Sequence, residues 1–104
     1  MVIIFQNYKA RKQLVHNGEV FTFRTKPHKL GKDWITDMRC GKKICDVEVV
    51  QCFKINNSDE LKPFVNASGF ETLTQWIDAI YLLHKYKIHE TIEGYVWFVT
   101  RVLK

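Results

Sequence analysis

The sequence predicts a single α+β domain, in which about five strands form a small, partly closed barrel and two or three helices pack against it. Three observations predict this class. The 104 residues suffice for one domain, the composition is 46% hydrophobic and 26% charged, and strand-like segments alternate with helix-like ones from the start of the chain. We therefore expect residues 1–104 to form one domain with one sheet.

The first predicted elements are a strand and a helix. Val2–Phe5 is a short apolar run typical of a strand. Asn7 is a favourable N-cap for a helix that runs to about His16. Asn17 and Gly18 end that helix, because both residues tolerate the left-handed backbone of a helix exit.

The next strand, Val20–Lys26, alternates between apolar and polar side chains. Phe21 and Phe23 lie on one face, and we expect this pair in the core. The opposite face presents the polar side chains Thr22, Arg24 and Lys26.

A hairpin and two helices follow. Asp33–Arg39 and Lys43–Ile55 read as paired strands, and a short helix is expected near Glu60–Asn66. A longer helix begins either near Ser68 or near Thr72, since both positions fit a capping box. Its apolar stripe comprises Leu73, Trp76, Ile77, Ile80, Leu83 and His84, and a last strand covers Tyr95–Leu103.

Positive charge is concentrated in the first part of the chain. Residues 1–43 hold ten Lys or Arg against three Asp or Glu, a net of +7, whereas the rest has a net of −2. This asymmetry favours a polyanionic or phosphate-bearing partner. No apolar run reaches the roughly 18 residues of a membrane span, so no membrane association is predicted. Three cysteines cannot all be paired within the chain, which favours a reducing, cytoplasmic compartment.

The polar strand face is the first candidate site. The Thr22 hydroxyl both donates and accepts hydrogen bonds, Arg24 offers a planar fork for phosphate or carboxylate, and Lys26 adds a point charge. The alternative is a solvated face of a half-exposed strand, which the pattern alone favours.

The order of motifs resembles the ASCH (activating signal cointegrator homology) domain, a relative of the PUA fold. Asn17–Arg24 is similar to the family signature GxKxxTxR. The hairpin with Gly41-Lys42-Lys43, the Ser68–Glu71 segment and the closing strand follow in the family's order. The resemblance covers nearly the whole chain and implies a PUA-like barrel.

The signature departs from the family at two positions. Asn17 stands where the family has Gly, and Glu19 where it has Lys. Some members are amidohydrolases acting on acetylated cytidine, and the resemblance implies that they use this lysine, the threonine as nucleophile and a glutamate ahead of the long helix. Here Thr22 is in place, while Glu71 lies two positions from the family glutamate. The departure at Glu19 therefore argues against that chemistry.

Two functions follow as predictions. The first is binding of nucleic acid, RNA above all, in a basic cleft formed by Thr22, Arg24, Lys26, Lys29, Lys32, Lys42 and Lys43, with Lys9 and Lys12 as further contacts. The second is hydrolysis of a modified nucleoside or of RNA, with Thr22, Glu19 or Glu71 in the chemistry. A nucleotide or nucleoside ligand is compatible with both, and a protein partner for the basic face stays open.

Other residues give weaker signals. Trp34 lies among basic residues and could stack a base, although a core position is favoured because tryptophan is usually well buried. The four histidines show no metal-ligand spacing, and no motif predicts a cofactor.

Overall fold

A computed structural model describes residues 2–5, 7–37, 41–84 and 92–102, without the side chains of residues 2, 83 and 84. The elements in chain order are strand β1 (Val2–Ile4), helix α1 (Tyr8–Asn17), strands β2 (Glu19–Arg24), β3 (Gly31–Thr36) and β4 (Cys45–Ile55), the 3-10 helix η1 (Ser58–Ala67), helix α2 (Leu73–His84) and strand β5 (Gly94–Arg101). None of the described helices is long and apolar enough to cross a membrane.

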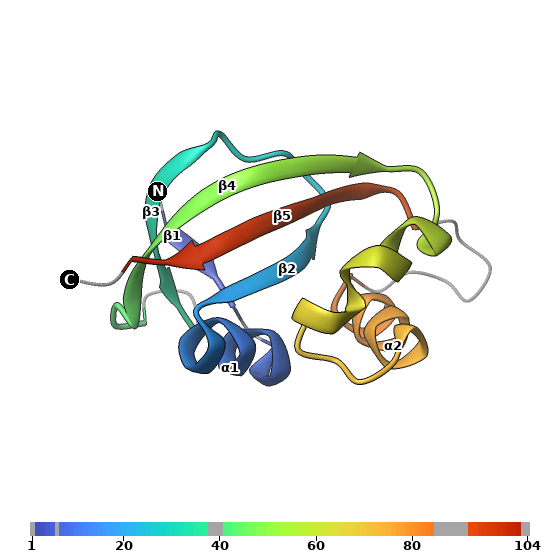
Figure 1. Ribbon diagram of the computed structural model, residues 1–104, viewed down its shortest axis with the longest axis horizontal. Helices are drawn as coiled ribbons and strands as arrows, with labels where there is room; N and C mark the ends of the chain where they lie inside the picture. The colour runs from blue at the N-terminus through green and yellow to red at the C-terminus, as the bar shows by residue number, and fades with distance from the viewer. Residues whose placement is uncertain (1, 6, 38–40, 85–91, 103–104) are drawn as a thin grey trace.

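The described strands form one mixed sheet in the order β1-β3-β4-β5-β2. β1 and β3 are parallel, and the other neighbours are antiparallel. A register shift between Val49 and Gln51 marks a bulge in the long strand β4, which raises the local twist. The sheet curls into a half-barrel, with α1 beneath β2 and with η1 and α2 at one end (Figure 1). The predicted α+β class is confirmed.

The core consists of two clusters, and β2 contributes to both. The first lies between α1 and the sheet and contains Ile3, Phe5, Ala10, Leu14, Val20, Ile35, Val47, Val49, Trp97 and Val99. The second lies beneath η1 and α2 and contains Phe23, Ile55, Leu61, Phe70, Trp76, Ile80, Ile92 and Val96. Phe23 is buried and Phe21 packs against the second cluster, so the predicted aromatic pair is confirmed.

The predicted ends of α1 are confirmed. Asn7 Oδ1 accepts hydrogen bonds from the backbone N–H groups of Lys9 (2.9 Å) and Ala10 (3.2 Å). At the other end, Gly18 has a φ of +84°, and its N–H donates to the Leu14 carbonyl at 2.9 Å. Both helix ends were predictable because the Asn7 cap and the Gly18 exit each act within one helical turn.

The start of α2 is also resolved. The Thr72 hydroxyl accepts from the Gln75 N–H at 3.1 Å and caps the helix. Ser68 instead donates to the Val65 carbonyl (2.7 Å) and accepts from the Phe70 N–H (3.2 Å), so it orders the turn before α2. The side chains of Leu83 and His84 lie outside the described part of the chain.

The predicted hairpin pairs β3 with β4, and several bounds differ from expectation. β3 begins at Gly31 rather than at Asp33, β4 begins at Cys45 rather than at Lys43, and residues 38–40 of the expected strand lie outside the described residues. β2 ends at Arg24, so Lys26 lies on the loop after it and not on the strand. The short helix begins at Ser58, because Asn57 and Glu60 form a reciprocal capping box ahead of the predicted start.

Gly69 brings the segment before α2 directly against the first turn of α1. Its φ is +91°, and a Cβ atom there would lie 2.3 Å from the Lys9 carbonyl oxygen and 2.7 Å from its carbon. A backbone contact this close requires glycine. It fixes the distance between α1 and the start of α2, and thereby the width of the space between them.

We predict that Gly69→Ala destabilises the fold more than Gly18→Ala does. Both positions have positive φ, so each alanine costs about 1–2 kcal/mol of backbone strain. A Cβ at Gly18 meets nothing within 4 Å, whereas at Gly69 the collision with Lys9 adds about 1–3 kcal/mol. Urea denaturation of the two variants measures the difference, and equal losses would contradict the contact.

Candidate functional site

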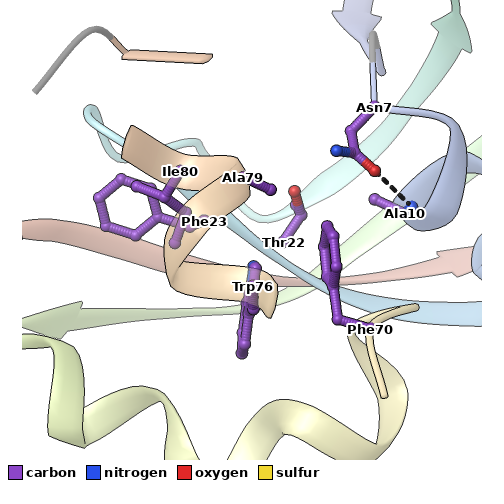
Figure 2. Close-up of a pocket in the computed structure, with 8 residues that line it drawn as sticks. All are labelled: Asn7, Ala10, Thr22, Phe23, Phe70, Trp76, Ala79 and Ile80. Atoms are coloured by element: carbon purple, nitrogen blue, oxygen red, sulfur yellow. Dashed lines mark hydrogen bonds between the residues drawn. The ribbon is translucent and has the colours of Figure 1, made fainter. Parts of the chain in front are cut away.

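A small pocket lies where β2, the start of α1 and α2 meet. We call it the Thr22 pocket (Figure 2); it is lined by Asn7, Ala10, Thr22, Phe23, Phe70, Trp76, Ala79 and Ile80. Its cavity volume is about 40 Å³, which is room for a few heavy atoms. It therefore admits the edge of a ring or a small substituent.

The Thr22 hydroxyl is the polar group at the base of this pocket. The residue is 7% exposed, and the hydroxyl has no hydrogen-bond partner in the described part of the chain. In Figure 2 its oxygen points into the space between α1 and α2. The oxygen is not among the fully buried side-chain atoms that lack a partner, so water reaches it through the pocket. A ligand that hydrogen-bonds Thr22 would replace that water.

Asn7 supplies a second polar group with a fixed orientation. Its Oδ1 accepts from two backbone N–H groups of α1, so its Nδ2 must point the other way. Figure 2 shows the Asn7 nitrogen on the side facing Ala79 and Thr22. The pocket thus presents an amide donor beside a hydroxyl.

Aromatic rings form much of the pocket wall. The rings of Phe70 and Trp76 are nearly parallel, with 13° between their planes and 6.4 Å between their centroids. Phe23 and Ile80 close another side, as the close-up shows (Figure 2). Flat apolar walls around a few polar groups are the usual build of a small-molecule site.

Arg24 lies two residues beyond Thr22 on the same face of β2. Its guanidinium carbon is 4.8 Å from the centroid of the Phe5 ring and 5.3 Å from that of Trp97. Burial lowers the pKa of Arg24 to about 10, so the side chain stays charged at pH 7. It has no carboxylate or hydrogen-bond partner among the described residues. Aromatic faces hold this cation and leave its donors available.

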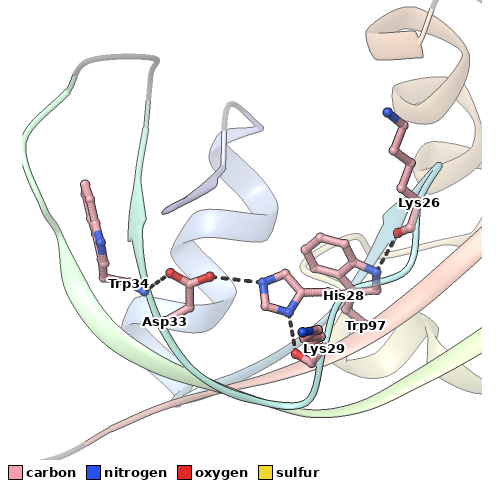
Figure 3. Close-up of polar contacts among 6 residues, drawn as sticks. All are labelled: Lys26, His28, Lys29, Asp33, Trp34 and Trp97. Atoms are coloured by element: carbon pink, nitrogen blue, oxygen red, sulfur yellow. Dashed lines mark hydrogen bonds and ion pairs between the residues drawn. The ribbon is translucent and has the colours of Figure 1, made fainter. Parts of the chain in front are cut away.

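A polar cluster orders the loop between β2 and β3 (Figure 3). The Trp97 indole N–H donates to the Lys26 carbonyl at 3.0 Å, and the His28 ring meets Trp97 edge-on. His28 Nε2 lies 3.0 Å from Asp33 Oδ2, and Nδ1 lies 2.5 Å from the Lys29 carbonyl. Both ring nitrogens therefore face acceptors, and a doubly protonated ring would donate to both.

The predicted lysines lie on the surface, outside the Thr22 pocket. Lys26, Lys29 and Lys32 are exposed on the β2–β3 loop and the start of β3. Lys42 and Lys43 are exposed just before β4, and Lys43 Nζ pairs with Asp46 Oδ1 at 2.6 Å. The described lining of the pocket includes none of the five.

The two glutamates of the hydrolytic hypothesis also lie outside the pocket. Glu19 is exposed at the start of β2, and Glu71 is exposed beside the outer face of α1. The described residues that line the Thr22 pocket carry no carboxylate, amine or imidazole. Within that lining, no group can take a proton from Thr22.

The remaining predictions have mixed outcomes. Trp34 is half-buried and belongs to neither core cluster, so its predicted core position is wrong. Cys45 and Cys52 are free thiols, and burial raises the pKa of Cys45. No group of three or more His, Cys, Asp or Glu side chains that could hold a metal is found among the described residues.

Sequence reasoning missed several site residues. Asn7 was predicted only as a helix cap, and Phe70 and Trp76 only as core or helix-entry residues. The Asn7 amide could have been found, because a capping oxygen forces the amide nitrogen away from the helix. The two rings could not, since their approach to Thr22 depends on how α2 packs against β2.

Comparison of the chain with protein-family models, with curated protein sequences and with solved structures found no match. The architecture itself is clear. The described residues form an α+β domain in which three helices pack against a five-stranded mixed sheet curled into a half-barrel.

We predict that Arg24→Met changes the free energy of unfolding at pH 7 by less than about 1.5 kcal/mol. The variant loses two cation–π contacts worth about 0.5–2 kcal/mol each, and it removes the cost of a desolvated charge. Methionine keeps most of the packing between the two rings.

Arg101→Met is the matched control. Arg101 Nη1 donates to the Val15 carbonyl, so this variant should lose about 1.5–3 kcal/mol. Chemical denaturation compares the two. A loss of about 3 kcal/mol or more for Arg24→Met would mean that Arg24 is a structural residue with a partner of its own.

Proposed function

We propose that this domain is a nucleic-acid-binding module of the ASCH type with RNA as its partner. One observation carries the proposal: the Thr22 hydroxyl lies at the base of an aromatic pocket, two residues from the Arg24 guanidinium, and neither group has a side-chain partner among the residues that the structure describes. Both groups gain from a ligand that combines a flat polar ring with a negative charge. A nucleotide has both.

The roles of the groups follow from their chemistry. Thr22 and the Asn7 amide hydrogen-bond the edge of a base or its substituent, while Phe70 and Trp76 contact its apolar faces. Arg24 binds a phosphate or a base edge through its planar donors. The pocket takes only the edge of the base, and the rest of the nucleotide lies outside it.

Surface charge supports a polymer rather than a free nucleotide. Lys26, Lys29 and Lys32 are exposed on and beside the ordered loop that follows Arg24. A chain of phosphates would engage several of these cations together, which a single nucleotide cannot do. The net charge of +7 on residues 1–43 also favours a polymer that carries many phosphates.

The order of motifs in the sequence supports the ASCH assignment, and the half-barrel architecture is compatible with it. The family's hydrolytic members motivate the alternative, an amidohydrolase acting on a modified nucleoside, because an unpartnered hydroxyl also suits a nucleophile. Such a threonine needs a basic partner, and the described lining of its pocket offers none. Glu19, in place of the family lysine, is exposed and outside the pocket. These facts favour binding.

The test is fluorescence anisotropy with a labelled single-stranded RNA of about ten nucleotides. We expect binding at low salt, with an affinity that falls steeply as salt rises. Thr22→Val removes the hydroxyl at nearly constant volume and should weaken binding about 5- to 10-fold, and Arg24→Met should weaken it at least 10-fold. Lys62→Ala, on the exposed face of η1, is the control and should bind like the wild type.

The proposal fails if the wild type binds no RNA at low salt, or if both Thr22→Val and Arg24→Met bind as it does. Incubation with acetylated cytidine, followed by separation of the products, tests the alternative. Deacetylation by the wild type that is lost in Thr22→Val would make the domain an enzyme.

A further inference from the structure

The first turn of α1 carries an exposed aromatic ring between cations. Tyr8 is 62% exposed. The guanidinium carbon of Arg11 lies 5.6 Å from the ring centroid and Nζ of Lys12 lies 6.0 Å from it. A large ring at this exposure buries little apolar area, so the core does not account for its position.

Several hollows border Tyr8, and two of them also share Lys9. An inner hollow of about 480 Å³ is bordered by Tyr8 and shares Asn7, Phe70 and Ala79 with the Thr22 pocket. An outer hollow of about 430 Å³ runs along α1 and is bordered by Tyr8 and Lys12. The Thr22 pocket therefore opens into a continuous concave path that passes Tyr8.

Charge along this path is mostly positive. Helix α1 has three Lys or Arg residues and no acidic residue. Lys9 stands where the two hollows meet, with Nζ 3.5 Å from Gln75 Oε1 and 5.7 Å from the centroid of the Phe70 ring. Asp78 and Glu71 each line one hollow and give the path an acidic far rim.

We propose that this path holds the single strand that continues from the nucleotide in the Thr22 pocket, with an unpaired base stacked on Tyr8. Lys9 and Lys12, which line this path, then contact the flanking phosphates. This inference rests on the proposed function and extends it to a second nucleotide. An exposed ring among cations is the arrangement that binds bases without sequence preference, because every base has a face to stack.

An acidic peptide is the competing partner for the same cations. It would need their charge but not the Tyr8 ring, whereas a stacked base needs the ring itself. The identity of the partner therefore depends on Tyr8 rather than on the lysines. Tyr8→Ala and Tyr8→Phe separate the two, since phenylalanine keeps the stacking surface and removes only the hydroxyl.

The experiment uses the full chain and a single-stranded RNA of about ten nucleotides that contains 2-aminopurine. We expect the fluorescence of 2-aminopurine to be quenched by stacking on Tyr8. Tyr8→Ala should relieve that quenching and weaken binding roughly 5- to 100-fold. Tyr8→Phe should bind within about twofold of the wild type, because its ring stacks equally well. A duplex RNA of the same length should lose little affinity in Tyr8→Ala, because its bases are already stacked.

A control variant and three outcomes decide between the possibilities. Leu82→Ala removes another exposed apolar side chain, 84% exposed on α2, and should bind like the wild type. If Tyr8→Ala binds RNA as the wild type does while Thr22→Val is impaired, the Tyr8 inference fails and the proposed function stands. If the wild type binds no RNA, both fail. If a polyglutamate peptide displaces the RNA and binds Tyr8→Ala equally well, the partner of α1 is an acidic protein segment.

Discussion

The structure depends on β2, a strand that is covered on both faces. Val20 belongs to the cluster beneath α1, and Phe23 belongs to the cluster beneath η1 and α2. Beyond the exposed Glu19 at its start, the strand runs between these two cores, so its polar residues Thr22 and Arg24 are largely covered as well. Thr22 lies where the two clusters meet, and Arg24 lies against Phe5 and Trp97 of the first. The same packing that stabilises the fold thus creates a pocket with a polar base.

The chain encodes much of this locally. Strand alternation, the Asn7 cap and the Gly18 exit act over a few residues, and all were predictable. Strand alternation also predicted that Thr22 lies on the face opposite Phe21 and Phe23, but not which residues cover that face. That depends on α2, which is about 50 residues away along the chain, and on the contact between Gly69 and Lys9, which sets its approach. The alternation of apolar and polar residues along a strand is the same whether the polar face is exposed to solvent or covered by a helix.

The surroundings of Arg24 illustrate the same limit. Its two aromatic neighbours come from the N-terminal segment and from the last strand, and only the curled sheet brings Phe5 and Trp97 together. The Trp97 indole N–H also donates a hydrogen bond to the Lys26 carbonyl, and the two residues are 71 positions apart in the sequence. The β2–β3 loop, which carries Lys26 and Lys29, is therefore fixed in part by Trp97, a residue that no local sequence pattern links to this loop. Trp34, for which a core position was predicted, lies outside both clusters.

The helix cap at Asn7 has a chemical consequence. Its carbonyl oxygen is committed to two N–H groups of α1, so the amide cannot flip without exposing the end of the helix. The pocket therefore offers a donor at this point, and a ligand atom placed against it has to be an acceptor. A keto oxygen or a ring nitrogen satisfies Asn7, whereas an exocyclic amino group would set donor against donor. The residue that starts a helix thereby favours an acceptor atom over an amino group at this one point of the pocket, with no rearrangement of its own side chain.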